Sequence, residues 1–309
     1  MKLIRGGINL RDQQQPCVAT IGNFDGVHLG HQRIIKRLIE KGKSLGLPAS
    51  VITFEPQPLE FFSSAEAPPR LTRLREKYCE LAKLELDRVI ILPFNQPFAQ
   101  LSPEAFVHEL LVDKLHVKHL VVGDDFRFGK KRAGTFAYLQ QAAKQYQFEV
   151  ANTETVFHDD ERISSSRIRQ LLKDNQLDAA SQLLGRPYTI CGRVAHGDKR
   201  GRTINFPTAN VHLNRIRSPL NGVYAVQFET EDGNIYPGVA NLGRRPTVSG
   251  SLDTRLEVHL LDFSGDLYGQ QSTTTFLKHI RDERKFDSFD ALKNQIQLDT
   301  VEASAFFNR

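Results

Sequence analysis

Cysteine is scarce in this chain of 309 residues, which has only three, at positions 17, 79 and 191. Their number is odd, and their wide spacing matches neither a disulfide framework nor a cysteine-rich metal site. No apolar run approaches the length that crosses a membrane, and the first residues lack the apolar centre of a signal peptide. These absences predict a protein of a reducing compartment, and we expect a cytoplasmic location.

Long blocks of one charge and low-complexity segments are missing as well. The net charge is +5 and the pI is about 9.1, so the chain suits anionic ligands. Acidic residues are interspersed among the basic ones, however, and no basic tail or aromatic-basic surface typical of nucleic-acid binding occurs. We expect small phosphorylated ligands as partners, without nucleic acid or membrane, while the composition leaves the oligomeric state open.

Two patterns of secondary structure divide the chain. From about residue 18 to 156, short apolar runs alternate with helical stretches, which predicts a parallel sheet covered on both faces. From Tyr188, short runs rich in Val, Tyr, Thr and Phe predict a compact antiparallel barrel, followed by a helix over 289–306. The expected strands are 18–21, 49–54, 89–92, 119–122, 148–152, 188–194, 222–228, 236–240, 256–261 and 273–277. The expected helices of the first half are 32–45, 72–84, 102–115 and 135–146.

The most informative segment runs from Gly22 to His31 and reads GNFDGVHLGH. An apolar stretch precedes it and helical spacing follows it, which predicts a loop between a strand and a helix that starts near Leu29. Free backbone N–H groups and the dipole at a helix N-terminus attract phosphate. The imidazoles of His28 and His31 can hydrogen-bond a phosphate whose charge grows during transfer.

Other interpretations of the two histidines are possible. An isolated histidine is more often a surface or capping residue. A His-x-x-His metal site is disfavoured because no Glu follows the first histidine, as it does in a zincin helix, and no acidic or cysteine ligand adjoins. The ten residues together resemble the His-x-Gly-His signature of the nucleotidylyltransferases, which join a nucleotide to a phosphorylated acceptor.

Two later blocks of the first half carry groups that suit the same ligand. Residues 123–129 (GDDFRFG) place carboxylates, an arginine and two phenylalanines after a predicted strand. Residues 163–169 (ISSSRIR) place three hydroxyls and two arginines at a predicted helix start, where they can hold a di- or triphosphate. Each block alone would be a capped turn or a helix cap. Their order behind the histidine motif favours ligand binding.

These blocks resemble the N-terminal module of the bacterial bifunctional riboflavin kinase/FAD synthetases over about residues 15–185. In that family the module transfers AMP from ATP to FMN. The resemblance implies that His28 and His31 are catalytic and contact the ATP phosphates. The other ATP- or pyrophosphate-binding residues that it implies are Gly22, Asn23, Phe24, Asp25, Ser164, Ser165 and Arg169. The flavin-binding residues that it implies in this half are Asp125, Phe126 and Phe128.

The second half has its own motif at residues 201–210, which read GRTINFPTAN. Proline fixes the turn, and Thr208 and Asn210 offer hydroxyl and amide oxygens that suit Mg²⁺. On composition alone, a polar turn between two strands is the simpler interpretation. The sequence contains no Walker lysine loop, so a kinase built on this motif would hold phosphate in another way.

This motif resembles that of the riboflavin kinases, and the resemblance continues at 222–225, 238–243, 256–262 and 266–269. It implies that Glu257 is the base that takes the proton of the ribityl 5′-hydroxyl as that oxygen attacks the γ-phosphate of ATP. Simple strand alternation would instead make Glu257 an outward-facing residue. The metal ligands that the resemblance to the riboflavin kinases implies are Thr208 and Asn210. The ATP-binding residues that it implies are Gly201, Thr203, Pro207, Thr208 and Asn210.

A loop near the C-terminus completes the resemblance. It implies that the loop closes over flavin, whereas by composition alone it is a solvated run of charges. Its residues are Arg281, Glu283, Arg284 and Phe286.

The two halves together predict an α/β plus β protein. We expect a Rossmann-like nucleotidylyltransferase domain over 1–184 and a six-stranded antiparallel β-barrel kinase domain with a terminal helix over 185–309. The resemblance implies that riboflavin and ATP give FMN, and that FMN and ATP give FAD and pyrophosphate. One alternative is a kinase joined to an adenylyltransferase for another acceptor. A second alternative is a flavin-binding regulator without turnover.

Overall fold

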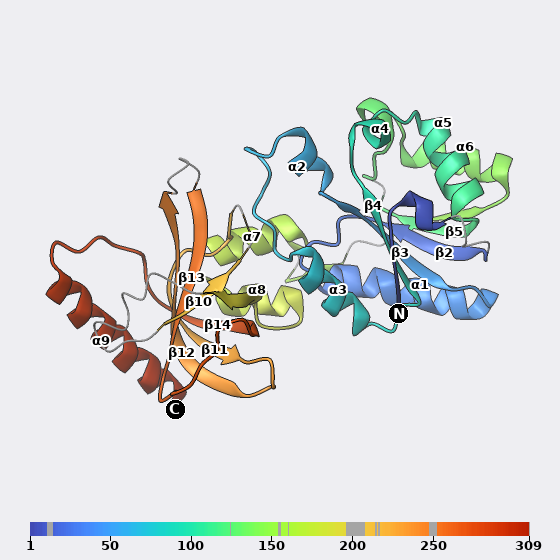
Figure 1. The fold of residues 1–309 in the computed structure, drawn as a ribbon. Helices are drawn as coiled ribbons and strands as arrows, with labels where there is room; N and C mark the ends of the chain where they lie inside the picture. The colour runs from blue at the N-terminus through green and yellow to red at the C-terminus, as the bar shows by residue number, and fades with distance from the viewer. Residues whose placement is uncertain are drawn as a thin grey trace. The chain divides into compact units, whose positions relative to one another are not determined.

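The computed structural model describes residues 1–10, 15–123, 125–153, 156–159, 161–195, 208–213, 215, 217–246 and 252–308. Contacts divide the chain into two compact units (Figure 1). The first consists of Met1–Pro68 and Lys77–Ile163, and the second of Pro69–Glu76 and Ser164–Arg309. Gly201, Thr203 and Pro207, which the kinase resemblance implicates, lie outside the described residues.

The first unit is built on a six-stranded parallel sheet with the strand order β1-β4-β3-β2-β5-β6. The strands are β1 (Lys2–Arg5), β2 (Cys17–Ile21), β3 (Ala49–Glu55), β4 (Arg88–Pro93), β5 (Val117–Val122) and β6 (Glu149–Asn152). Every residue of β2 is buried, as expected for a parallel strand covered on both faces. The five predicted strands of this half are confirmed. The edge strand β1 was not predicted, because only Ile4 of its four residues is buried.

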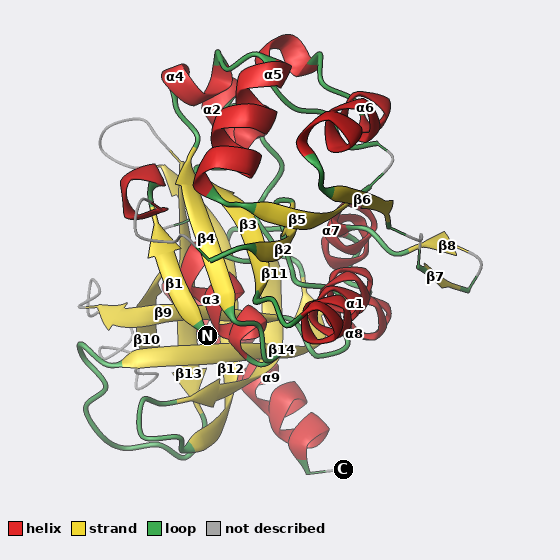
Figure 2. Ribbon diagram, turned by 90° about the vertical axis from the view of Figure 1, so that its right-hand side faces the viewer, coloured by secondary structure: helices red, strands yellow, loops and turns green. Residues whose placement is uncertain are grey.

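Helices cover both faces of this sheet, with α1 on one side and α5 and α6 on the other (Figure 2). The longer helical elements are α1 (Leu29–Leu45), α3 (Leu74–Ala82), α5 (Pro103–Ala105), which continues as the π-helical η2 (Phe106–Lys114), and α6 (Phe136–Tyr146). The short elements are η1 (Gly7–Leu10), α2 (Pro58–Phe62), α4 (Gln96–Ala99), η3 (Lys130–Arg132) and the antiparallel pair β7 (Phe157–His158) and β8 (Glu161–Arg162). The Ser102 hydroxyl accepts a hydrogen bond from the Ala105 N–H at 3.0 Å, which starts α5 as predicted.

The second unit is a closed antiparallel barrel with the strand order β10-β13-β12-β11-β14-β9. Its strands are β9 (Thr189–Ala195), β10 (Thr208–His212), β11 (Gly222–Glu229), β12 (Ile235–Pro246), β13 (Leu252–Leu260) and β14 (Gln271–Arg281). Its helices are α7 (Ser165–Lys173), α8 (Leu177–Leu184) and α9 (Phe289–Phe307). The predicted barrel and terminal helix are confirmed. The strand β10 was not among the predicted runs, because only two of its five residues are buried.

The segment Pro69–Glu76 is bound into the second unit by buried polar contacts. One nitrogen of Arg215 donates to the Arg70 carbonyl and to the Tyr188 hydroxyl, both at 3.1 Å, and another pairs with the Glu76 carboxylate. Burial by itself lowers the pKa of Arg215, but Tyr188 and Glu76 outweigh burial and raise it. The guanidinium therefore stays charged, and it holds the segment in place.

Helix α9 packs against the barrel through a small apolar cluster and one buried ion pair. Ala303 lies among Val223, Ala225 and Val239, while the Arg281 guanidinium contacts both oxygens of the Asp299 carboxylate, at 2.9 and 2.8 Å. None of the helices in the described parts of the chain has the length and apolar character needed to span a bilayer.

Candidate active sites in the two units

The histidine motif occupies the loop between β2 and α1. His28 is the N-cap of α1, and its Nδ1 accepts a hydrogen bond from the His31 N–H at 3.3 Å. The two imidazole rings are stacked, with centroids 3.6 Å apart and planes inclined by 17°. A Cβ on Gly30 would lie 3.1 Å from Nδ1 of His28, so glycine leaves room for the ring close to the helix. The loop therefore presents both imidazoles at the helix N-terminus, as predicted.

The backbone of this loop is strained. Phe24 and Val27 have φ values of 47° and 43°, which bulky and β-branched residues rarely adopt. Both side chains are buried, as is Asp25 between them. Strain of this kind persists only where the surrounding structure enforces it, and it is common at ligand sites. Burial of Phe24 and Val27 thus fixes the path of the loop.

His31 lies in an environment that opposes its protonation. Burial lowers its pKa well below the usual value of 6.5, and electrostatic interactions with His28 and Lys77 lower it further. Its Nδ1 is buried and has no hydrogen-bond partner within the described part of the chain. A neutral ring with a free nitrogen is suited to contact a ligand.

Lys77 was missed by the sequence analysis. Its side chain is almost completely buried in the first unit, near enough to His31 to lower the pKa of that residue. The sequence did contain a sign of this burial, because Lys77 lies at helical spacing on the apolar face of α3. The other residues of that face are Leu74, Tyr78 and Leu81. A lysine in such a position needs an electrostatic reason to be buried.

Aromatic side chains gather beyond the carboxyl ends of β3, β4 and β5, at the edge of the sheet where the histidine loop also lies. Phe126 and Phe128 are stacked with centroids 5.6 Å apart, and Phe128 fits over Gly134, where a Cβ would approach the ring to 2.6 Å. A second group, not predicted from sequence, makes successive ring contacts and includes Phe62, which is 65% exposed. Its members are Phe54, Phe61, Phe62, Phe94 and Phe98.

Asp125 in the same region is exposed and lies 3.8 Å from the Arg162 guanidinium. The hydroxyl block of the first half belongs by contacts to the second unit. Ser164 caps α7, its hydroxyl accepting from the Arg167 N–H at 3.2 Å, and Ser165 is the first helical residue. The Arg169 Nε donates to the Pro69 carbonyl at 2.8 Å. The hydroxyls are thus at a helix start, as predicted.

In the barrel, three polar residues form one row across adjacent strands. Asn210 of β10 is paired with Glu257 of β13, and Glu257 is paired with Asn241 of β12. Directly paired residues point to the same face of a sheet, and the flanking Leu256 and Val258 are buried on the other face. We call this set the Asn210–Glu257–Asn241 row.

The row contains an oxygen with no partner. Oδ1 of Asn241 is buried and receives no hydrogen bond within the described residues. The Asn210 amide nitrogen donates to the Thr208 carbonyl at 3.4 Å. The side-chain oxygens of Asn210 and Thr208 are the atoms that could coordinate a metal ion. Asn241 was not predicted as a site residue, although a single amide in an otherwise apolar strand is a signal of this kind.

The loop after β14 divides into two parts. Arg281 is engaged with Asp299 of α9, whereas Arg284 lies over the Phe286 ring at 5.0 Å from its centroid. A Cβ on Gly243 would collide with the Glu283 carboxylate, so the loop lies against β12. The loop residues therefore approach the strand that carries Asn241.

No cluster of three or more His, Cys, Asp or Glu side chains that could hold a metal occurs among the described residues. Magnesium, however, is usually bound by one or two protein oxygens together with substrate phosphates. The unpartnered Asn241 oxygen beside Glu257, with Thr208 and Asn210 on the neighbouring strand, fits that donor chemistry.

A Rossmann-like sheet with a His-x-Gly-His loop and a barrel with a Thr-Ala-Asn strand define a two-unit nucleotide-dependent transferase. Residues 10–167 match the FAD synthetase family and residues 184–307 match the riboflavin kinase family. The chain belongs to the family of bifunctional riboflavin kinase/FMN adenylyltransferases.

Individual relatives agree over the full length. The Haemophilus influenzae bifunctional riboflavin kinase/FMN adenylyltransferase is 50% identical over 308 residues and covers 100% of both chains. The Escherichia coli K12 protein of the same name is 51% identical over 308 residues, which span 99% of this chain and 98% of the relative. A crystal structure from Streptococcus pneumoniae, described as a macrolide-efflux protein, has 31% identity and a TM-score of 0.80 over 98% of this chain and 99% of that one. That description concerns the S. pneumoniae protein alone.

Proposed function

We propose that this chain makes both flavin cofactors, with riboflavin phosphorylated by the barrel and the resulting FMN adenylylated by the parallel-sheet domain. We assign residues 1–184 to the FMN adenylyltransferase domain and residues 185–309 to the riboflavin kinase domain. The observation that carries the proposal is the pairing of the two family matches with the histidine loop in one matched region and the Asn210–Glu257–Asn241 row in the other. Riboflavin, FMN and ATP are the small-molecule substrates.

In the adenylyl transfer, a phosphate oxygen of FMN attacks the α-phosphorus of ATP, and pyrophosphate leaves as the bond between the α- and β-phosphates breaks. His28 accepts at Nδ1, so its neutral ring carries the proton on Nε2 and can donate it to a phosphate oxygen. His31 is kept neutral by burial and offers a second contact. Lys77 adds positive charge near His31. These groups stabilise the charge that develops on the phosphates.

Other residues of the first site bind the two substrates. The ATP loop consists of Gly22, Asn23, Phe24 and Asp25, and the pyrophosphate-binding residues are Ser164, Ser165 and Arg169. The stacked Phe126 and Phe128, together with the exposed ring of Phe62, offer flat apolar faces for the flavin ring. Asp125 is exposed and can accept hydrogen bonds from the flavin.

In the kinase step, the ribityl 5′-oxygen attacks the γ-phosphorus of ATP and ADP leaves. Glu257, at the centre of its row, takes the proton of that hydroxyl. Thr208 and Asn210 would hold Mg²⁺ with the ATP phosphates, and the ion would neutralise negative charge there. Asn241, paired with Glu257, offers a further oxygen that has no partner among the described residues. Glu283, Arg284 and Phe286 close over the flavin, while Arg281 fixes their loop to α9.

The proposal includes a cytoplasmic location. The three cysteines are free, which agrees with a reducing compartment.

The test is to incubate the purified protein with riboflavin, ATP and Mg²⁺ and to separate the flavins by chromatography. We expect FMN and then FAD to appear. FMN alone would support a kinase joined to an adenylyltransferase for another acceptor. Unchanged riboflavin in a folded protein that binds flavin would overturn the proposal in favour of a regulator.

A further inference from the structure

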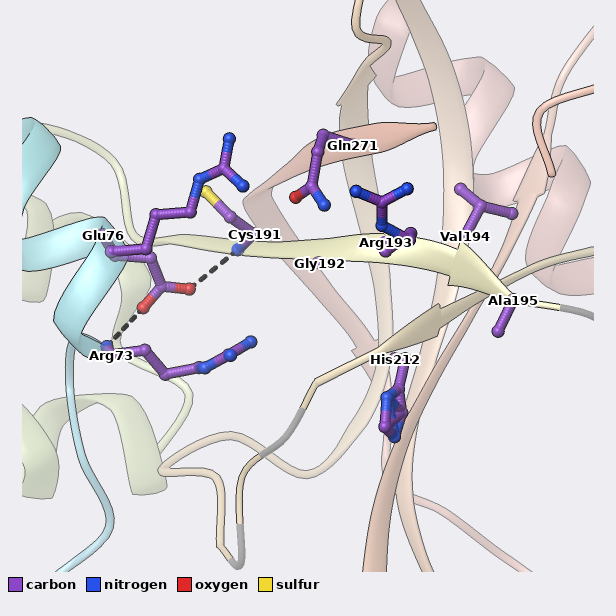
Figure 3. A pocket seen from close by; sticks show the side chains of 10 residues that line it. Arg73, Glu76, Cys191, Gly192, Arg193, Val194, Ala195, His212 and Gln271 are labelled. Atoms are coloured by element: carbon purple, nitrogen blue, oxygen red, sulfur yellow. Dashed lines mark hydrogen bonds between the residues drawn. The ribbon is translucent and has the colours of Figure 1, made fainter. Parts of the chain in front are cut away.

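A cavity of about 520 Å³ lies on the outside of the barrel, within the second unit (Figure 3). Strands β9, β10 and β14 form one wall, and the segment before and at the start of α3 forms the other. Arg193 of β9 is paired with His212 of β10 and with Gln271 of β14, so these three side chains share one face. In Figure 3 the Arg73 side chain extends from the start of α3 toward this wall. We call this space the arginine cavity.

The charge of the arginine cavity is strongly positive. Arg73, Arg75 and Arg193 all line it, and Glu76 is the one carboxylate among the described lining residues. Both oxygens of Glu76 are already occupied, because they accept from the Cys191 and Arg73 N–H groups at 2.9 and 2.6 Å and pair with Arg215. Glu76 is therefore neutralised by an arginine that does not line the cavity.

Two of these guanidiniums form no ion pair among the described residues, although the Glu76 carboxylate attracts that of Arg73. Neither Arg73 nor Arg75 forms an ion pair within the described part of the chain. Burial lowers the pKa of Arg73, and the positive charges of Arg215 and Arg70 contribute to this against the opposing effect of Glu76. Arg73 nevertheless remains protonated at neutral pH, and the unbalanced positive charge favours an anion.

The cavity has the size of a small-molecule site, since such sites measure roughly 300–1,000 Å³. Guanidiniums bind phosphate oxygens in pairs of parallel hydrogen bonds. We propose that the arginine cavity is a second binding site of the barrel for a nucleotide-sized phosphate ester with two or more negative charges. Arg73 and Arg75 bind the phosphates, and Arg193 and Gln271 contact the rest of the ligand.

The arginine cavity borders the kinase row but extends away from it. Its lining residue Ala195 is paired with Asn210 of the row, and the cavity runs from there past His212 to Cys191 and α3. Glu257, Asn241 and Thr208 do not line it. A ligand there would be either an adenine nucleotide or a flavin nucleotide, which share the phosphate chemistry, and the test separates the two.

Cys191 gives a local readout, because it lines the cavity and is partly exposed. Cys17 is buried, and Cys79 is exposed but can be replaced by Ser. In a Cys79→Ser protein, we expect pyrophosphate, ADP or FMN at saturation to slow maleimide labelling of Cys191 by about tenfold or more. The double variant Arg73→Gln/Arg75→Gln should show less than a twofold effect. The more strongly protecting nucleotide, ADP or FMN, identifies the natural ligand class.

A matched control replaces two exposed cations of the first unit, Arg5→Gln/Lys36→Gln, and should keep the protection of Cys191. Calorimetric titration of the same proteins should show one binding event fewer in the Arg73/Arg75 variant, whether or not Cys191 labels readily. Equal labelling with and without every probe and an unchanged number of binding events would overturn the proposal. Protection of Cys191 that survives in the Arg73→Gln/Arg75→Gln variant would also overturn the proposal. A rise in the kinase KM for ATP in that variant, parallel to its loss of protection, would overturn it as well. The last result would make the cavity part of the kinase nucleotide site. Cys191 labelling and calorimetry measure binding and do not depend on turnover. A negative result in them therefore differs from a failure to form FMN or FAD, which would contradict the proposed function.

Discussion

The histidine pair shows how burial changes the chemistry of single residues. His28 is oriented by the N–H of the residue with which it stacks, so one hydrogen bond fixes both its ring and its tautomer. His31 is held neutral by burial and by neighbouring positive charge. A neutral imidazole at His31 avoids repelling the charge of the buried Lys77.

The lowered pKa of His31 predicts a pH dependence of stability. Between this lowered pKa and the usual value of 6.5, the unfolded chain binds a proton that the folded protein does not bind. The free energy of unfolding therefore falls as pH drops below about 6.5, by at most about 1.4 kcal/mol per pH unit from this group. His31→Asn removes that contribution.

Urea unfolding at pH 7.5 and pH 5.5, followed by circular dichroism, measures the effect. The wild-type protein should lose about 1 kcal/mol more stability than His31→Asn over this interval. An equal loss in the two proteins would show that His31 titrates normally in the folded state.

Residues in contiguous motifs could be predicted from the sequence, whereas residues that depend on packing could not. His28 and His31 are close in the chain, and Glu257 stands within a long matching block, so their local sequence was enough. Lys77 and Asn241 matter because of neighbours contributed by other elements. Such neighbours are visible only once the helix and the sheet have been assembled.

Helix α9 illustrates the energetics of a single element. It is tied to β14 by two ion pairs of different burial. Arg281–Asp299 is largely buried, with side-chain exposures of 19% and 3%, while Lys278–Glu302 is open, with 39% and 46%. The buried pair therefore should dominate the attachment of the helix, since exposed pairs contribute little.

Asp299→Asn and its matched control Glu302→Gln test this difference on the same helix. The first leaves a buried guanidinium without a counter-charge and should cost about 3–5 kcal/mol. The second should cost less than about 1 kcal/mol. Denaturant unfolding of both variants measures the two values. A similar small loss in both would contradict the assigned role of Asp299 and leave α9 held by apolar contacts alone.

The elements that could be predicted have long apolar patterns. Strand β2 is buried throughout, and the apolar runs of β11 and β13 are long enough to identify. Strands β1 and β10 were missed because each buries few residues of its short length. Their place is fixed by pairing with β4, β9 and β13, which no local pattern reveals.

For the whole molecule, the two-part fold followed from the change of pattern along the sequence. The grouping of Pro69–Glu76 with the second unit did not. It depends on Arg215 and Tyr188, which are 139 and 117 residues distant from the residues they bind, Glu76 and Leu71. Contacts over such separations leave no periodic signal.

The central claim at this scale is that the histidine loop of the first half serves the adenylyl transfer and the Asn210–Glu257–Asn241 row serves the kinase step. The most direct measurement is the flavin content formed by Glu257→Gln and by His28→Asn/His31→Asn, each supplied in turn with riboflavin and with FMN, with ATP and Mg²⁺ present. Glu257→Gln should make FMN from riboflavin at least about 100-fold more slowly yet convert supplied FMN to FAD at the wild-type rate. The histidine variant should make FMN and stop there. Loss of both activities in either folded variant would contradict the account.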